Sequence, residues 1–174
     1  RGRAGECRAP RLVAAWILAV ALTLTAVAFI VVERFGYDSH AYWAAWQGPM
    51  FGPRPGEPDA YLYSPAFAHA LWVPAQLPWP AFAALFAIGL LACLVWLLRP
   101  LERRWWLPLG IIGLNEVAAG NVYLVLAVVA VLGFRHPAVW AFPALTKITP
   151  CVGPLWFLAR REWRALAISV GATV

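Results

Sequence analysis

A carboxylate, an imidazole and two phenols lie close together in the segment Phe35-Gly-Tyr-Asp38-Ser-His40-Ala-Tyr42-Trp. The segment begins three residues after Leu12–Val32, an apolar run that contains no charged side chain. If a helix continued past Val32, Asp38 would lie about 9 Å beyond that residue, roughly at the depth of the lipid headgroups. This position suits polar chemistry at a membrane surface, where the phosphate of a lipid carrier lies. Alternatively, Asp38 caps a helix formed by the residues that follow it.

Lys147 is the only lysine of the chain, and it lies within the apolar run 137–159. Ionisable groups inside apolar membrane segments are costly, and they commonly mark functional sites. Pro143, Pro150 and Pro154 can break a helix in this run, so that Lys147 would lie near the elbow between two half-helices. A lysine at such a break could bind a phosphate as a point charge. The alternative is a lysine that snorkels or is paired within the membrane.

Two aromatic groups accompany these residues. Trp43 and Trp46 follow Asp38, and Tyr61 and Tyr63 occur in the motif Tyr-Leu-Tyr-Ser-Pro. Their rings could stack on sugars, or they could anchor the surrounding loop at the membrane interface. The sequence leaves both interpretations open.

The acidic residues give little indication of a metal site. Asp38 with Glu57 or Asp59 could hold a divalent ion, but no paired His and Asp ligands occur at metal-binding spacing. We therefore expect no cofactor. Glu116 lies in an apolar stretch near Gly120-Asn121, where we expect an interfacial position without a catalytic role.

The composition indicates an integral membrane protein, because 63% of the residues are hydrophobic and only 13% are charged. As a helix, the 21 residues Leu12–Val32 would be about 31 Å long, enough to cross the hydrocarbon core. A cleaved signal peptide is disfavoured, since no small-x-small cleavage site follows Val32. The net charge of +6 comes from short Arg clusters between apolar runs, which predicts topology signals and no nucleic-acid partner. The clusters are Arg1, Arg3, Arg8 and Arg11; Arg99, Arg103 and Arg104; and Arg160, Arg161 and Arg164.

These clusters predict how the chain is threaded through the bilayer. By the positive-inside rule the N-terminus is cytoplasmic, so the first membrane helix, residues 12–32, leads to an extracytoplasmic loop, residues 33–63. Glycine and proline are frequent in residues 48–58, which predicts turns. Residues 64–174 should form further membrane helices.

In that second part, three prolines predict a short interfacial or re-entrant helix before a span over residues 81–98. Residues 107–134 could form one long helix or two that meet near Gly120, and we favour two. We therefore expect an all-α fold, a polytopic integral membrane protein with transmembrane and re-entrant helices.

The order of these features resembles glycosyltransferase family 87, the polyprenyl-phosphate-dependent membrane glycosyltransferases that include mannosyl- and arabinofuranosyltransferases. The motifs that carry the resemblance are Asp38-Ser-His-Ala-Tyr42-Trp-Ala-Ala, Tyr61-Leu-Tyr-Ser-Pro65, Gly120-Asn121 and Leu145-Thr-Lys147-Ile-Thr-Pro150. The resemblance covers essentially the whole chain, as the N-terminal part of one longer membrane enzyme domain. Where the family pattern would be Gly-Gln-x-Asn, this sequence has Gly120-Asn121-Val-Tyr123.

The resemblance implies a sugar, with mannose favoured, presented on a polyprenyl phosphate on the outer side of the plasma membrane. It also implies that Asp38 deprotonates the hydroxyl of a lipid or glycan acceptor, while a cation stabilises the leaving phosphate. The candidate cations, in descending order, are Lys147, Arg54, Arg34 and His40. The predicted substrate-binding residues are Lys147, His40, Tyr42, Arg54, Tyr61, Tyr63 and Asn121.

Two other classes of protein fit part of the pattern. A transporter or lipid flippase would also use broken helices with an intramembrane lysine, but it gives no reason for an outer loop rich in aromatic residues around an Asp. A membrane scaffold would tolerate changes at Asp38 and Lys147 apart from effects on folding.

Overall fold

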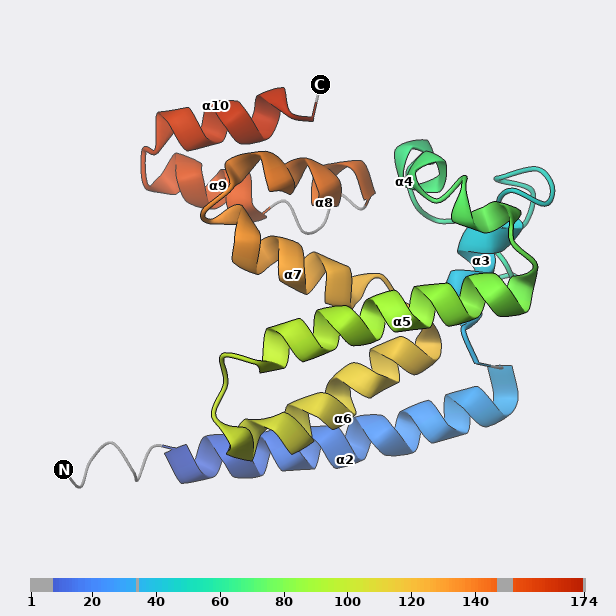
Figure 1. The fold of residues 1–174 in the computed structure, drawn as a ribbon, viewed down its shortest axis with the longest axis horizontal. Helices are drawn as coiled ribbons and strands as arrows, with labels where there is room; N and C mark the ends of the chain where they lie inside the picture. The colour runs from blue at the N-terminus through green and yellow to red at the C-terminus, as the bar shows by residue number, and fades with distance from the viewer. Residues whose placement is uncertain (1–7, 34, 147–151, 174) are drawn as a thin grey trace.

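The computed structural model describes residues 8–33, 35–146 and 152–173, and in this part of the chain every regular element is a helix, without strands (Figure 1). The elements are α2 (Arg8–Glu33), α3 (Tyr37–Ala44), α4 (Pro65–Ala70), the 3-10 helix η1 (Pro74–Gln76), α5 (Trp79–Leu98), α6 (Arg103–Ala119), α7 (Tyr123–Gly133), the 3-10 helix η2 (Pro137–Trp140), α8 (Ala141–Thr146), α9 (Val152–Ala159) and α10 (Trp163–Gly171). The expectation of an all-helical protein is confirmed for these residues.

Helix α5 is the one helix within the described ranges that is long and apolar enough to cross a membrane. Its 20 residues span about 30 Å. The helix begins at Trp79 with Pro80 in its first turn, where a missing N–H costs nothing, and it ends before Arg99-Pro100. Ile88 is 63% exposed, as expected for a side chain that contacts lipid. The predicted helix over residues 81–98 is therefore confirmed, two residues longer at its start.

Helix α2 contains the predicted helix 12–32 and extends it at both ends. It lies along α6 for much of its length (Figure 1). That α2 crosses the membrane stays a prediction.

The run 107–134 forms two helices, as favoured, because α6 ends at Gly120. Gly120 has φ 72°, in the left-handed region that only glycine adopts without strain. The N–H of Asn121 donates to the carbonyl of Glu116 at 3.0 Å and closes the end of α6. The chain then turns back into α7 (Figure 1).

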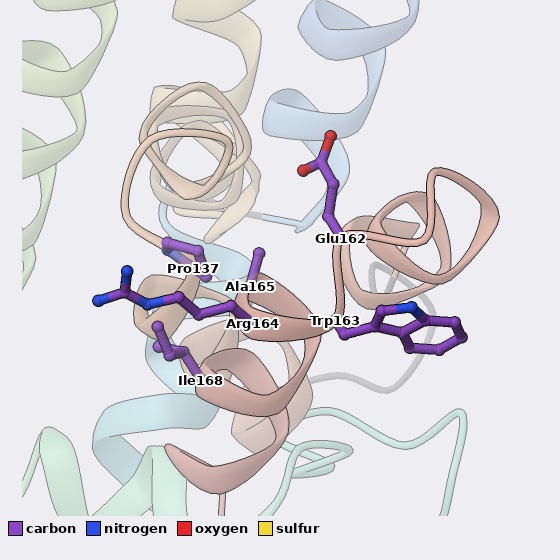
Figure 2. A pocket seen from close by; sticks show the side chains of 6 residues that line it. All are labelled: Pro137, Glu162, Trp163, Arg164, Ala165 and Ile168. Carbon is purple, nitrogen blue, oxygen red and sulfur yellow. The ribbon is translucent and has the colours of Figure 1, made fainter.

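The last part of the chain consists of short helices. Helix α8 precedes residues 147–151 and α9 follows them, as expected for two half-helices, but Lys147 itself lies outside the described residues. Helix α10 packs against η2 and α9. Figure 2 shows Pro137 beside Arg164, Ala165 and Ile168 at an open pocket of about 410 Å³, with the Trp163 ring directed away.

An aromatic core surrounds α3 and holds it against α4 and α5. Tyr42 is fully buried, and its ring lies 5.0, 5.2 and 5.7 Å from the rings of Tyr63, Phe67 and Phe86. Trp46 donates its indole N–H to the carbonyl of Ala68 at 2.9 Å. Burying such large rings is a main source of stabilisation, so this cluster fixes the position of α3.

The two ends of the structure differ in their elements. Helices α3 and α4 and the loop 45–64 lie at one end, to the right in Figure 1. The beginning of α2, the end of α5, the beginning of α6 and the end of α7 lie at the other, to the left. The basic loop after α5 and the basic residues after α7 are thus at the same end.

Candidate active site

Asp38 lies in the first turn of α3, and the backbone before it explains its position. Gly36 occupies the N-cap position with φ 77°, a left-handed conformation. Its N–H donates to the carbonyl of Ala118, near the end of α6, at 2.8 Å. The N-cap interpretation of Asp38 is therefore wrong: Gly36 begins the helix, and the Asp38 side chain is available for another interaction.

That interaction is with Asn121, whose Nδ2 donates to Oδ2 of Asp38 at 2.7 Å. The donor follows Gly120 directly, so the turn that ends α6 also aims the amide at the carboxylate. A hydrogen bond to an ionised acceptor is stronger than one between neutral groups. Oδ1 of Asn121 is buried and has no hydrogen-bond partner among the described residues. The pair fixes the orientation of the Asp38 carboxylate.

A close backbone contact positions this pair. A Cβ atom added to Gly120 would lie 2.3 Å from Oγ of Ser39, far inside van der Waals contact. Ser39 is buried, and its hydroxyl donates to the carbonyl of Gly36 at 2.9 Å. Because only glycine fits here, α3 and the end of α6 approach closely enough for Asn121 to reach Asp38.

Asp38 and Asn121 line a cavity of about 250 Å³ between α3, the loop 45–64 and the α6–α7 junction. Its polar side chains are Asp38, Asn121, Glu57, Asp59, Tyr37, Tyr42 and Tyr63. Carboxylates accept hydrogen bonds from hydroxyl groups, and phenols both donate and accept them, which suits a sugar or another polyol. Glu116, expected to have no catalytic role, lies near enough to Asp38 for the two carboxyl groups to interact electrostatically. Within the described residues no group of three or more His, Cys, Asp and Glu side chains could hold a metal ion.

The two tyrosines of the motif at residues 61–65 have different surroundings. The Tyr42 hydroxyl donates to the Tyr63 hydroxyl at 3.0 Å at the wall of the cavity. Burial, together with Tyr63, raises the pKa of Tyr42, which therefore stays a neutral donor. Tyr61 is only 3% exposed, and its hydroxyl donates to the carbonyl of Ser64 at 2.9 Å. Burial raises the pKa of Tyr61 as well. Its ring packs in the core and anchors the loop, whereas Tyr63 borders the cavity.

His40 and Arg54 contact residues that line the cavity. Nδ1 of His40 lies 2.5 Å from Oδ1 of Asp59, and the imidazole packs against the Trp79 ring at 4.6 Å. The backbone N–H of Arg54 donates to Oε2 of Glu57 at 2.8 Å. His40 thus positions Asp59 and the Arg54 backbone positions Glu57.

The loop motif also reaches the segment that precedes Lys147. The Ser64 hydroxyl donates to the carbonyl of Leu145, and the Ser64 N–H donates to the carbonyl of Thr146 at 3.4 Å. The Phe67 ring packs on Phe142 of α8. Lys147 and Arg34, two of the predicted cations, lie outside the described residues.

The family model of glycosyltransferase family 87 matches residues 61–174, well over half of the chain. No curated protein and no solved structure matches the chain. The chain therefore belongs to glycosyltransferase family 87, a membrane-associated family, and the resemblance read from the sequence is confirmed. Asn121 lies within the matched residues and Asp38 precedes them, so the hydrogen bond between the two joins Asp38 to the matched region.

Several residues that build the site were not predicted. Gly36 and Ser39 fix the approach of α3 to α6, and Tyr37 borders the cavity. One signal was present in the sequence, because glycine is also a favoured N-cap residue, although less so than Asp. From the sequence, Glu57 and Asp59 were considered only as metal ligands. In the structure they line the same cavity as Asp38.

Proposed function

We propose that this protein transfers a sugar, mannose in the first instance, from a polyprenyl phosphate to a lipid or glycan acceptor at the extracytoplasmic surface of the plasma membrane. Glycosyltransferase activity follows from the family. The observation that supports the site is the Asp38 carboxylate, oriented by Asn121 at 2.7 Å and bordering a cavity with three phenol groups.

In the proposed reaction Asp38 acts as general base. An acceptor hydroxyl attacks the anomeric carbon, a new C–O bond forms, and Asp38 takes the hydroxyl proton. The bond between the anomeric carbon and the phosphate oxygen breaks, and its electron pair leaves with the phosphate. A phosphate is a good leaving group, so one carboxylate suffices, in contrast to the pair of a glycosidase.

The other carboxylates of the cavity fit a role in binding. Asp59 is paired with His40, and Glu57 accepts from the backbone N–H of Arg54. Carboxylates held in this way accept hydrogen bonds from sugar hydroxyls and fix the orientation of the substrate. Lys147 is the proposed cation for the leaving phosphate; Ser64 of the loop motif hydrogen-bonds to Leu145 and Thr146, the two residues that precede Lys147 in the sequence.

The distribution of basic residues supports a cytoplasmic N-terminus and an extracytoplasmic Asp38. The basic loop after α5 lies at the end opposite to α3, as does the end of α7 (Figure 1). Under the positive-inside rule that end faces the cytoplasm, which directs the cavity of Asp38 to the other side.

The test is sugar transfer from radiolabelled polyprenyl-phosphate-mannose to endogenous lipid acceptors, in membranes that contain the full-length protein. Asp38→Asn should abolish transfer, since it keeps the size and polarity of the side chain but removes the base. Asp59→Asn, a matched change in the same cavity, should reduce transfer without abolishing it. Protein levels are equalised by immunoblot.

Equal transfer by the wild type and Asp38→Asn would remove Asp38 from the mechanism. Movement of the labelled lipid across the bilayer, without transfer by either form, would favour the transporter alternative. If the protein transfers sugar only from a polyprenyl-phosphate-arabinofuranose, the proposed role of Asp38 stands and the donor sugar is arabinofuranose instead of mannose.

A further inference from the structure

A second cavity, of about 580 Å³, lies between the end of α5 and the end of α7. Arg99 and Arg135 line it together with apolar side chains, among them Trp96, Val131 and Leu132. The ends of α5 and α7, whose residues line it, lie at the end of the structure opposite to α3, the helix that contains Asp38 (Figure 1). The proposed transferase chemistry does not use it.

The two arginines converge on this cavity without an acidic partner. No Asp or Glu is among the residues that line it, and neither arginine takes part in an ion pair within the described ranges. Other basic residues nearby in sequence differ: Arg104 is paired with Glu102, and Arg160 with Glu162 at 2.7 Å. Two arginines that line one cavity suit a phosphate, because guanidinium groups bind phosphate through paired N–H donors.

The remaining wall of the cavity is apolar and comes from the end of α5, the helix that can cross a membrane, and from the end of α7. Trp96 is on the last turn of α5 and is 38% exposed, and Val131 on α7 is 54% exposed. Tryptophan near the end of such a helix is typical of the interface between headgroups and acyl chains. Cationic groups therefore lie at the rim, next to an apolar surface that continues along α5 into the hydrocarbon depth.

We propose that this cavity binds an anionic phospholipid. The phosphate lies between Arg99 and Arg135, and the acyl chains lie along Trp96 and Val131. A lipid explains both halves of the cavity, whereas a free phosphate would leave the apolar wall uncovered. The inference rests on α5 crossing the membrane and is independent of the transferase reaction. In the proposed orientation the lipid belongs to the cytoplasmic leaflet.

Native mass spectrometry of the full-length protein, purified in detergent and titrated with phosphatidylglycerol or phosphatidylcholine, tests the proposal. The wild type should retain phosphatidylglycerol in preference to phosphatidylcholine. Arg99→Gln with Arg135→Gln should weaken retention of phosphatidylglycerol about 30-fold, which corresponds to about 1 kcal/mol for each basic residue. Retention of phosphatidylcholine should not change.

The matched control is Arg103→Gln with Arg161→Gln, which removes the same charge from exposed positions that do not line the cavity. It should bind phosphatidylglycerol as the wild type does. Equal weakening in the control would show attraction to net charge only, and would overturn the proposal. So would unchanged binding in the Arg99 and Arg135 double variant.

Two further arms distinguish a lipid from a free anion and from misfolding. Val131→Trp fills the apolar wall while it leaves both arginines in place, and it should also weaken retention of phosphatidylglycerol. Inorganic phosphate should displace the lipid poorly, and displacement at equal concentration would identify a simple anion site instead. Unfolding temperatures of all variants within a few degrees of the wild type exclude loss of the fold.

Discussion

At the α3 end of the molecule, charged groups are bound by neighbouring polar groups: Asn121 donates to Asp38, and His40 lies 2.5 Å from Asp59. At the opposite end, Arg99 and Arg135 border a cavity whose lining contains no carboxylate. Groups that must hold one orientation through a reaction require such partners, because positioning supplies much of the rate. Groups that attract a mobile anionic ligand do not. The polar groups at the α3 end are thus held in place before a ligand binds, whereas the arginines at the opposite end would receive their polar partner from the ligand.

After Asp38→Asn, which should abolish transfer, the largest effect is expected for Asp38→Glu, which keeps the charge but moves the carboxylate by one methylene. If the hydrogen bond from Asn121 sets a reactive geometry, transfer should fall about 100-fold, since a misplacement near 1 Å can cost this much. The initial rate with saturating donor measures it. A rate near that of the wild type would mean that the negative charge alone matters and that the α3 end is not preorganised.

Gly120→Ala should disturb the same end through the backbone. The new Cβ would lie 2.3 Å from Oγ of Ser39, at a φ of 72° that alanine adopts only with strain. We expect a loss of about 2 kcal/mol in the free energy of unfolding, and a lower transfer rate. Thermal denaturation in detergent measures the first. Gly89→Ala, where no atom lies within 4 Å of the added Cβ, should leave the unfolding temperature unchanged or raise it.

Asn121→Ala should lower transfer about tenfold while the protein stays folded, because it removes a donor to a charged carboxylate. The effect should be on kcat more than on KM, since the carboxylate remains but loses its orientation. Asn115→Ala is the matched control: its Nδ2 is buried and has no partner among the described residues. A larger loss of activity in the control would contradict the assignment.

Tyr63→Phe should have a smaller effect. It removes the hydroxyl that accepts from Tyr42 at 3.0 Å, and a lost hydrogen bond of this kind costs about 1 kcal/mol. The unfolding temperature should fall by a few degrees, and transfer should be reduced by less than about fivefold. If instead transfer is abolished at an unchanged unfolding temperature, Tyr63 takes part in the chemistry.

The smallest effect on transfer is expected at the opposite end. Arg99→Gln with Arg135→Gln should leave the rate in detergent within about twofold of the wild type, since surface changes away from a site usually alter stability by less than about 0.5 kcal/mol. The same transfer assay measures it. A loss of transfer as large as that of Asn121→Ala would show that the two ends depend on each other, which would contradict the contrast drawn between them.

Much of the fold could be predicted because apolar runs and proline positions carry local information. The helices 12–32 and 81–98, the turn-rich loop and the break at Gly120 all follow from residues that act on their own segment. The site depended on contacts between distant segments. Asn121 was predicted as a substrate-binding residue, but its role as the partner of Asp38 could not be, because it arises from the packing of α3 on α6.

The same limit explains the two tyrosines. Tyr61 and Tyr63 are separated by one residue, and nothing local distinguishes them, yet one is in the core and the other borders the cavity. Their ring partners differ as well: Tyr61 packs on Phe51, and Tyr63 packs on Tyr42 and Phe67. An aromatic pair in a loop therefore predicts a contact surface without predicting which ring contacts the ligand.

The contact between Gly36 and Ala118 also sets an order of biosynthesis. The N–H of Gly36 and the carboxylate of Asp38 have their partners at Ala118 and Asn121, which the ribosome makes much later. Until Asn121 has been made, the Asp38 carboxylate lacks the amide that donates to it in the folded protein. The pair of Asp38 and Asn121, which borders the cavity, therefore forms only after the turn at Gly120 has been synthesised.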